Sequence, residues 1–399
     1  MPDPPILPAG FLAAGIHCGI KSDPQKHDLS LFVSERPSVA AGVFTTNRVC
    51  GAPITVCRER VPSATIRAVL INSGNANACT GQRGIDDAKS SAKNVSSRLN
   101  CQEEDVLVLS TGVIGRLLPM ESLSAGVPTL INQLANTSDA FRQAARGMMT
   151  TDTVPKQSVR RVEMGGGTVT VSGAAKGAAM IAPNMATMLA VVMTDAVISR
   201  IDADAILRAS VERTFNRISI DGHTSTSDAV LLMANGASGV DTTNEVAKDA
   251  VASAIAAVCG ELCEAIVRDA EGATHFVTVD VQGLLTEEDA VRVARAVADS
   301  PLVKTAIAGA DPNWGRVISA AGHSGVFFEE QELSLDMNGV SVYRDGIPRP
   351  FDAKALSTAI RESRDTSLLL TFAKGDASAR ILTSDLTAEY VRLNADYTT

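Results

Sequence analysis

The segment with the clearest chemical potential is residues 176–195, KGAAMIAPNMATMLAVVMTD. Small residues and a proline precede Ala186 and Thr187, and an apolar, strand-like run follows them from Met188 to Met193. If the bond between Ala186 and Thr187 breaks, the Thr187 hydroxyl lies beside a free α-amine, a base whose ordinary pKa is about 8. Such an amine is one of the known ways to activate a threonine hydroxyl, so one residue would supply both nucleophile and base. On spacing alone, the start of a buried strand is the commoner interpretation of this pattern.

Three other segments gather small or polar residues that can contact a ligand. The glycine-rich segment LSTGVIG, residues 109–115, lets backbone N–H groups approach an anion, although an ordinary turn has the same composition. It lacks both the dinucleotide fingerprint and the Gly-Lys-Ser/Thr of a phosphate loop. The segments MTTDT (149–153) and DGHTSTSD (221–228) are interpreted as turns, and His223 as a loop histidine rather than a base.

Composition narrows the class of protein. The chain has 399 residues, of which 45% are hydrophobic and only 4% aromatic, which predicts two or three domains with aliphatic cores of helices packed on sheets. The net charge is −9 and no basic tract occurs, which argues against nucleic acid as a partner.

The chain also lacks the sequence signals of export. Its apolar runs are broken by polar residues before the ~20 residues that a membrane span needs, and MPDPPILPAGF at the N-terminus has no signal-peptide pattern. The seven cysteines are scattered and the five histidines form no motif, so we expect free thiols, no metal site and a cytoplasmic location.

The elements that must position these residues alternate irregularly between strand and helix. Strands are predicted at 40–45, 54–57, 68–71, 106–109, 187–193 and 276–281, with a hairpin over 159–171. Helices are predicted at 86–99, 120–134, 139–149, 202–215, 243–268 and 287–298, the last capped by Thr286. Strands at 302–307, 333–335, 340–343, 367–372 and 379–382 and a helix at 352–363 predict a smaller C-terminal α/β unit. The pattern favours a mixed-sheet α/β or α+β sandwich over a doubly wound fold.

Taken together, the motifs resemble those of the ornithine acetyltransferase family, the bifunctional glutamate N-acetyltransferase/amino-acid acetyltransferase of arginine biosynthesis. The matching segments run from one end of the chain to the other: SGNANACTG (73–81), STGVIGRLLPM (110–120), MTTDTVPK (149–156), KGAAMIAPNMATML (176–189), DAEGAT (269–274), LVKTA (302–306), DPNWGR (311–316) and YVRLNADYTT (390–399). The resemblance implies an autoproteolytic enzyme of the N-terminal-nucleophile type with a DmpA aminopeptidase-like fold.

The resemblance also implies how the chain is divided. Cleavage between Ala186 and Thr187 would give an α chain (1–186) and a β chain (187–399), associated as a heterotetramer of two of each. Residues 187–283 would complete the main catalytic domain, and 284–399 would form the smaller domain. Small and turn-forming residues before Thr187 suit a strained bend that presents the Ala186 carbonyl to the threonine hydroxyl.

The roles implied for the remaining residues follow the same match. Thr187 would take the acetyl group of N2-acetyl-L-ornithine and pass it to L-glutamate, with Thr111 and Gly112 stabilising the oxyanion. The implied substrate-binding residues are Thr150, Lys176, Thr187, Glu271, Asn394 and Thr399. Lys176 suits a substrate carboxylate and Glu271 an ammonium. No cofactor is implied, and use of acetyl-CoA as a second donor is left open.

Three alternatives remain at this point. The first is an N-terminal-threonine aminopeptidase or amidase of the same fold, which passes the acyl group to water. The second is an uncleaved, inactive paralogue that binds a small molecule. The third is a paralogue with the same chemistry on another acyl-amino acid.

Overall fold

The structure is a computed structural model that describes residues 5–181 and 188–396. The predicted cleavage site at Ala186 and Thr187, and Thr399, therefore lie outside the described residues. By its contacts the chain divides into two compact units: unit 1 comprises Met1–Asn216 and His223–Ile266, and unit 2 comprises Arg217–Gly222 and Val267–Thr398. Unit 2 thus includes residues 267–283, which the sequence analysis assigned to the main domain, because the strand Phe276–Leu284 pairs with two strands near the C-terminus.

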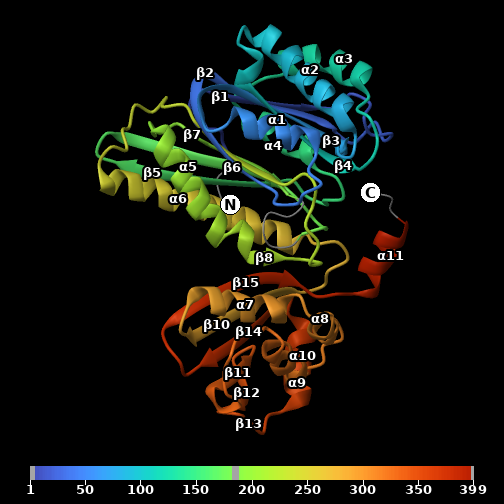
Figure 1. Cartoon of the computed structure of the whole chain (residues 1–399), viewed down its shortest axis with the longest axis vertical. Coiled ribbons are helices and arrows are strands. Elements are labelled where there is room, and N and C mark those ends of the chain that lie inside the picture. The colour runs from blue at the N-terminus through green and yellow to red at the C-terminus, as the bar shows by residue number, and fades with distance from the viewer. Residues whose placement is uncertain (1–4, 182–187, 397–399) are drawn as a thin grey trace. The chain divides into compact units, whose positions relative to one another are not determined.

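Unit 1 contains an eight-stranded mixed sheet (Figure 1). Its strands are β1 (Phe11–Ile16), β2 (Leu29–Phe44), β3 (Ser63–Asn75), β4 (Val106–Val113), β5 (Lys156–Met164), β6 (Gly167–Lys176), β7 (Leu189–Thr194) and β9 (Ala229–Ala234). The order is β4-β3-β2-β9-β7-β6-β5, with β1 paired to β2. The pairs β3–β4 and β7–β9 are parallel and the others are antiparallel.

The long strand β2 connects two parts of this sheet. Its first half pairs with both β1 and β3, and its second half pairs with β9. The register with β3 shifts between Val33 and Ser38, where residues 35–37 are exposed and include Pro37, which has no N–H to donate. This irregularity lets one strand serve two sets of neighbours.

Helices cover the sheet of unit 1. They are α1 (Ala52–Arg60), α2 (Gly81–Leu99), α3 (Met120–Asn132), α4 (Ser138–Met148), α5 (Arg200–Arg213) and α6 (Glu245–Arg268), whose last two residues belong to unit 2. Helices α1 and α2 pack on β4, and α4 packs on β1 and β2. The α4 backbone comes so close to β1 that a Cβ on Gly15 would lie 2.0 Å from the Gln143 carbonyl oxygen. The core formed here is almost entirely aliphatic, as the composition predicted.

Helix α6 is the one helix among the described residues that is long and apolar enough to cross a membrane by length and composition. Half of its most apolar stretch is buried. Val258 and Leu262 lie against β6, where a Cβ on Gly173 would be 2.8 Å from a side-chain carbon of each. Core helices pass the same test, so the finding is weak evidence for a span.

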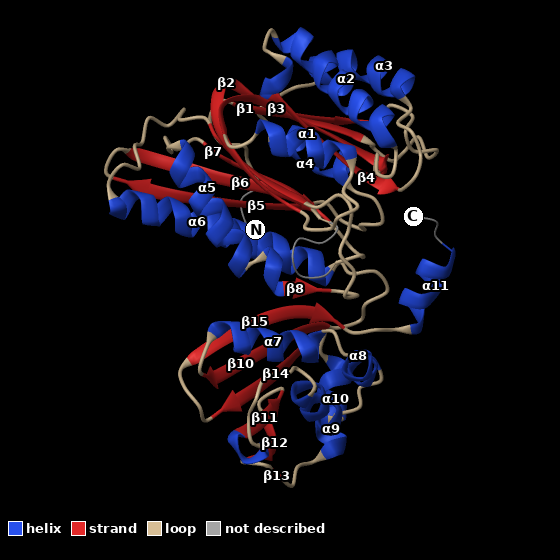
Figure 2. Cartoon of the chain, viewed as in Figure 1, coloured by secondary structure: helices blue, strands red, loops and turns tan. Residues whose placement is uncertain are grey.

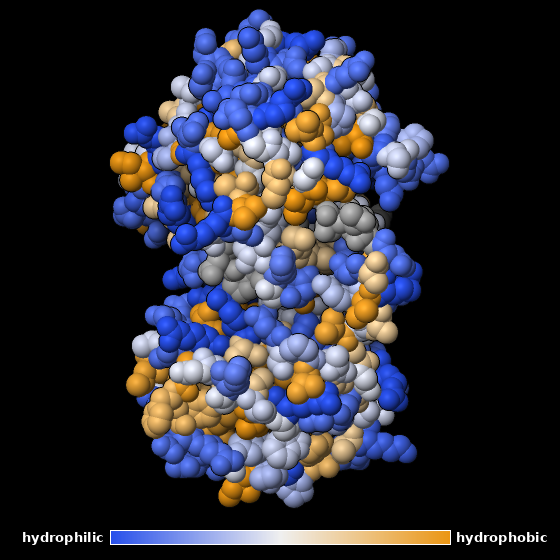
Figure 3. Space-filling view, turned by 45° about the vertical axis from the view of Figure 1, so that its right-hand side comes forward, coloured by the Kyte–Doolittle hydropathy of each residue, from blue (hydrophilic) through white to orange (hydrophobic). Residues whose placement is uncertain are grey.

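On the face drawn in Figure 3, polar and apolar side chains are intermixed.

Unit 2 is a seven-stranded sheet with helices packed on it (Figure 2). Its order is β13-β12-β11-β14-β10-β15-β8. The strands are β8 (Ile218–Ser219), β10 (Phe276–Leu284), β11 (Leu333–Met337), β12 (Val340–Arg344), β13 (Ile347–Pro348), β14 (Asp365–Phe372) and β15 (Ala377–Ser384). The helices are α7 (Glu287–Ala298), α8 (Pro301–Ala308), α9 (Trp314–Gly322), α10 (Ala353–Glu362) and α11 (Ala388–Asp396). Across both units, short 3₁₀ turns lie at Glu103–Asp105, Phe215–Arg217 and Glu330–Glu332.

The predicted mixed α/β class is confirmed, but two predicted strands are wrong. Residues 54–57 lie in α1 and 302–307 in α8. In both places a proline stands in the first turn, and in α8 the Ser300 hydroxyl caps the helix by accepting from the Val303 N–H. These start signals outweigh the short β-branched runs. The hairpin around residues 165–167 and the Thr286 cap of α7 are confirmed.

Candidate active site

The backbone at the end of β4 adopts a conformation that only glycine accepts. In the parallel pair β3–β4, Ser73 lies opposite Thr111 and Gly74 opposite Gly112. Gly112 has a φ of +131°, and a Cβ there would lie 2.4 Å from the Gly74 carbonyl carbon. The backbones of β3 and β4 are therefore in direct contact at Thr111 and Gly112, the residues predicted to stabilise an oxyanion.

The asparagine-rich end of β3 fixes this backbone. The Asn72 amide accepts from the Ser110 hydroxyl at 2.6 Å and donates to the Asn75 carbonyl at 2.8 Å. The Ser73 hydroxyl donates to the Gly147 carbonyl at 2.7 Å. All of these side chains are buried, so the bend is rigidly supported.

Lys176 ends β6 inside the protein. Its side chain is 2% exposed, and its ammonium lies 3.3 Å from the Thr111 hydroxyl. In the antiparallel pair β6–β7, Lys176 lies opposite Leu189. The sheet register therefore brings a lysine, a β4 threonine and the first residues of β7 to one end of the unit.

A buried aspartate that the sequence analysis interpreted as a turn residue organises this cluster. Asp152 accepts hydrogen bonds from the Lys156 ammonium at 2.6 Å, the Gly177 N–H at 2.7 Å and the Thr150 N–H at 2.9 Å. Burial by itself would raise the pKa of Asp152, but the ammonium groups of Lys156 and Lys176 and these hydrogen bonds lower the pKa to about 2. Asp152 is thus an anion that ties Thr150 and the residue after Lys176 into one framework.

A third lysine adds positive charge nearby. The Lys21 ammonium donates to the carbonyls of His27 at 2.7 Å and Met149 at 2.6 Å. Burial lowers the pKa of Lys21 to about 8, and the charge of Lys176 acts in the same direction, whereas Asp28 and Asp152 oppose it. Lys21, Lys156 and Lys176 thus surround Asp152, and we call these four residues the lysine cluster. Ammonium groups gathered in this way can bind an anionic ligand.

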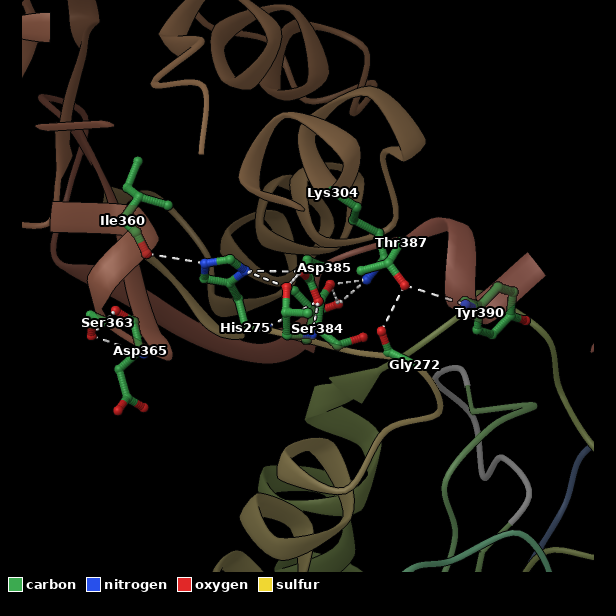
Figure 4. Close-up of polar contacts among 12 residues, drawn as sticks. Gly272, His275, Lys304, Ile360, Ser363, Asp365, Ser384, Asp385, Thr387 and Tyr390 are labelled. Atoms are coloured by element: carbon green, nitrogen blue, oxygen red, sulfur yellow. Dashed lines mark hydrogen bonds and ion pairs between the residues drawn. The ribbon is translucent and has the colours of Figure 1, made fainter. Parts of the chain in front are cut away.

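In unit 2, the predicted residues Glu271 and Asn394 contact each other. The Asn394 amide donates to the Glu271 carboxylate at 3.0 Å. Gly272 has a φ of +66°, and a Cβ on it would lie 2.5 Å from the Tyr390 nitrogen, so the loop comes into backbone contact with α11. The Thr387 hydroxyl fastens the same place by donating to the Gly272 carbonyl at 2.6 Å (Figure 4).

The other end of this loop is held by Asp385. Its carboxylate accepts from the Thr274 N–H at 2.9 Å, the Thr274 hydroxyl at 2.5 Å and the His275 N–H at 3.1 Å, and it lies 2.9 Å from Nδ1 of His275. Nε2 of His275 lies 3.1 Å from the Ile360 carbonyl, so the ring bridges β15 and α10 (Figure 4). Buried polar groups that are fully paired in this way hold a loop in one conformation.

The predicted site residues thus fall into two described groups. Thr111, Gly112, Thr150 and Lys176 come together in unit 1, and Glu271 and Asn394 in unit 2.

The sequence analysis missed Lys21, Asp152, Lys156 and Asp385. Asp152 and Lys156 lie in the matching segment MTTDTVPK and carry opposite charges four residues apart, whereas nothing local marks the other two. Among the described residues no group of three or more His, Cys, Asp or Glu side chains could hold a metal ion.

Two other residues of the quoted segments, Trp314 and His223, do not belong to either group. Trp314 stacks on Tyr343 with ring centroids 5.4 Å apart, so it packs within unit 2. His223 is exposed.

Comparisons with known proteins identify the family. The family model described as the ArgJ family matches residues 12–399. The "Arginine biosynthesis bifunctional protein ArgJ" of Rhodopirellula baltica is 44% identical over 99% of this chain and 97% of its own, and that of Geobacter sulfurreducens is 43% identical over 98% and 99%. A crystal structure of arginine biosynthesis bifunctional protein ArgJ from Bacillus halodurans matches with a TM-score of 0.51 and 34% identity, covering 52% of this chain and 98% of that one. The chain belongs to the ArgJ family, which confirms the resemblance drawn from its motifs.

Proposed function

We propose that this protein transfers the acetyl group of N2-acetyl-L-ornithine to L-glutamate through an acetyl ester on Thr187. The observation that carries the proposal is the contact of Lys176 with Thr111 beside the glycine-dependent bend at Gly112. It joins a buried cation to the segment whose backbone is suited to an oxyanion. The family match over residues 12–399 supports the same activity.

The proposed chemistry has two half-reactions. In the first, the Thr187 hydroxyl loses its proton to the α-amine of the same residue and attacks the acetyl carbonyl of acetylornithine. An ester bond forms, the amide C–N bond breaks, and the ornithine amine leaves with a proton. In the second, the amine of glutamate attacks the ester, the C–O bond breaks, and N-acetylglutamate leaves. Negative charge on the acetyl oxygen develops in both steps, where donors at Thr111 and Gly112 would lower the barrier.

The lysine cluster supports amino-acid substrates in particular. Acetylornithine and glutamate both carry an α-carboxylate, and a buried lysine pairs strongly with a carboxylate. Lys176 lies 3.3 Å from the Thr111 hydroxyl, so a carboxylate bound by Lys176 would lie beside the predicted oxyanion donors. Glu271 is proposed to bind the substrate ammonium, and Asn394 and Thr399 remain substrate-binding residues as the resemblance assigns them.

The active form in this proposal is the cleaved protein. The Thr187 hydroxyl attacks the Ala186 carbonyl, the peptide C–N bond breaks, and water hydrolyses the resulting ester to leave a carboxylate on Ala186 and a free amine on Thr187. The Bacillus halodurans chain is compatible with such a division, because it is matched over 98% of its length yet covers only 52% of this chain. We further propose a cytoplasmic heterotetramer of two α and two β chains that needs no cofactor.

The test begins with mass analysis of freshly purified protein under denaturing conditions. Two fragments, the heavier one beginning at Thr187, are expected, and the Thr187→Ala variant should give a single intact chain. A variant that still splits at this bond would exclude self-cleavage by Thr187.

The activity itself is tested by following ornithine release with and without glutamate. Exchange is expected to be far faster than hydrolysis. Release that does not depend on glutamate would instead identify an aminopeptidase or amidase, and an intact, inactive wild-type chain would identify a binding paralogue. Replacing acetylornithine by acetyl-CoA or by other acyl-amino acids in the same assay determines the range of donors.

A further inference from the structure

A second buried aspartate, Asp228, lies where three strands of unit 1 meet. It directly precedes β9, and its carbonyl accepts from the Thr45 N–H, just after β2, at 3.0 Å. Its carboxylate oxygen Oδ1 accepts from the Met188 N–H, just before β7, at 3.0 Å. The Met188 carbonyl in turn accepts from the Ala229 N–H at 3.1 Å. Met188 is therefore held on both sides by the chain around Asp228.

The surroundings of the Asp228 carboxyl are unusual for a structural aspartate. The residue is fully buried, and among the described residues its second oxygen, Oδ2, has no hydrogen-bond partner. An unpaired buried oxygen costs free energy, of the order of 1–3 kcal/mol in mutational data. Burial raises the pKa of Asp228 well above its ordinary value, against the Met188 N–H and the Lys176 charge, which favour the ionised form. A residue that is kept at such a cost is expected to have a role other than stability.

The position of Asp228 along the chain indicates that role. The Met188 N–H belongs to the peptide group whose carbonyl comes from Thr187, so a hydrogen bond to this N–H restrains the orientation of that peptide group. We propose that Asp228 is a positioning residue for Thr187: through Oδ1 it holds the N–H of Met188, the residue bonded directly to the nucleophile. The inference rests on the proposed function, since it assigns Thr187 the nucleophilic role.

The physical reason for such a residue is the steep dependence of acyl transfer on alignment. A displacement of the reacting atoms by about 1 Å can cost about 100-fold in rate. Strand pairing begins with Leu189 opposite Ala229, so Met188 is the last residue that the sheet itself can restrain. The contact from Asp228 extends that restraint by one peptide group toward Thr187.

The experiment compares Asp228→Ala, which removes the acceptor, with Asp228→Asn, which keeps an oxygen in the place of Oδ1. Three quantities are measured: the rate of self-cleavage, kcat and KM for acetylornithine-to-glutamate transfer, and Tm. We expect Asp228→Ala to slow both cleavage and kcat about 10- to 100-fold, with KM changed much less. We expect Asp228→Asn to restore both rates to within about threefold of the wild type. If the alanine variant is recovered only unfolded, Asp228→Leu, which has the same branching at Cγ, replaces it.

Asp195 provides a matched control at the opposite end of β7. It is also buried and also accepts from backbone N–H groups, those of Thr170 at 2.8 Å and Ala9 at 3.1 Å, so both of its oxygens are paired. Asp195→Ala should lower Tm and leave the cleavage rate of the folded protein and kcat near wild type.

The outcomes separate this inference from the proposed function. Wild-type rates in folded Asp228→Ala would overturn the positioning role alone. Equal losses in the alanine and asparagine variants would overturn it as well, since a group other than the retained acceptor would then be required. A wild-type protein that neither cleaves nor transfers acetyl groups would overturn the proposed function instead.

Discussion

The two units hold their predicted site residues by different means. In unit 1 the residues are fixed by buried charges: Asp152, Lys156 and Lys176 are all at least nine-tenths buried. In unit 2 Asn394 is exposed, and its bond to Glu271 is a solvent-exposed one. There the order comes from the backbone, through Gly272 and the bonds to Asp385. Substitutions in unit 1 should therefore affect stability and activity together, whereas side-chain substitutions at the unit 2 group should affect activity alone.

Gly112→Ala should have the largest effect. The added Cβ would lie 2.4 Å from the Gly74 backbone, at a φ that L-residues avoid, so the bend must move. Loss of one oxyanion donor costs about 100-fold or more in kcat, and Tm should fall as well. Gly115→Ala is the control, because its φ is also positive, at +80°, while nothing lies within 4 Å of the Cβ. Similar losses of kcat in both variants would contradict the close contact as the cause.

Asp152→Asn should reveal the buried charge of unit 1 through pH. The folded pKa of about 2 lies below the ordinary value of 3.8, so ionised Asp152 stabilises the fold above pH 4, and this contribution is lost as the pH falls toward 2. It is worth about 2 kcal/mol at neutral pH. The free energies of unfolding of variant and wild type should differ at pH 7 and converge below pH 4.

An exposed aspartate serves as the control for this measurement. A hydrogen bond from Arg142 also lowers the pKa of Asp139, but solvent screens that pair. Asp139→Asn should therefore follow the wild type at every pH. A difference between wild type and Asp152→Asn that persists unchanged at pH 2–3 would show that packing, not charge, is lost.

Gly272→Ala tests the backbone anchoring in unit 2. The added Cβ would meet the Tyr390 nitrogen at 2.5 Å and push α11 from the loop that carries Glu271. We expect KM to rise about 10-fold, equivalent to about 1.4 kcal/mol, with a smaller change in kcat. Gly222→Ala has nearly the same φ, +70°, and open space around the Cβ, so it carries the backbone strain alone. An equal rise of KM in that variant would exclude the contact with α11 as the cause.

Asn394→Ala should have the smallest effect. It removes two exposed hydrogen bonds, to the Glu271 carboxylate and to the Tyr390 carbonyl, each worth about 0.5–1 kcal/mol at most, so KM should rise a few-fold while Tm stays within error. Arg392→Ala, on the same helix and paired, within the described part of the chain, with Glu389 and Asp396, should leave KM unchanged. A clear fall of Tm in Asn394→Ala would show that the bond to Glu271 stabilises the unit, against the difference drawn between the two units.

The sequence by itself determined those features that neighbouring residues encode. The β5–β6 hairpin, the buried run of β7 and the Thr286 cap follow from alternation, turn residues and capping chemistry. The motif-bearing segments also placed Thr111, Gly112, Thr150 and Lys176 among the site residues, because the family motifs are short and contiguous.

Only the tertiary structure decided which charges meet. Asp152 has the sequence surroundings of a turn residue, Lys21 reaches the Met149 carbonyl across 128 positions, and Asp228 reaches Met188 across 40. Such contacts depend on sheet register and on which strands become neighbours. A single residue encodes neither, because pairing partners are fixed only when distant segments bury their apolar faces together.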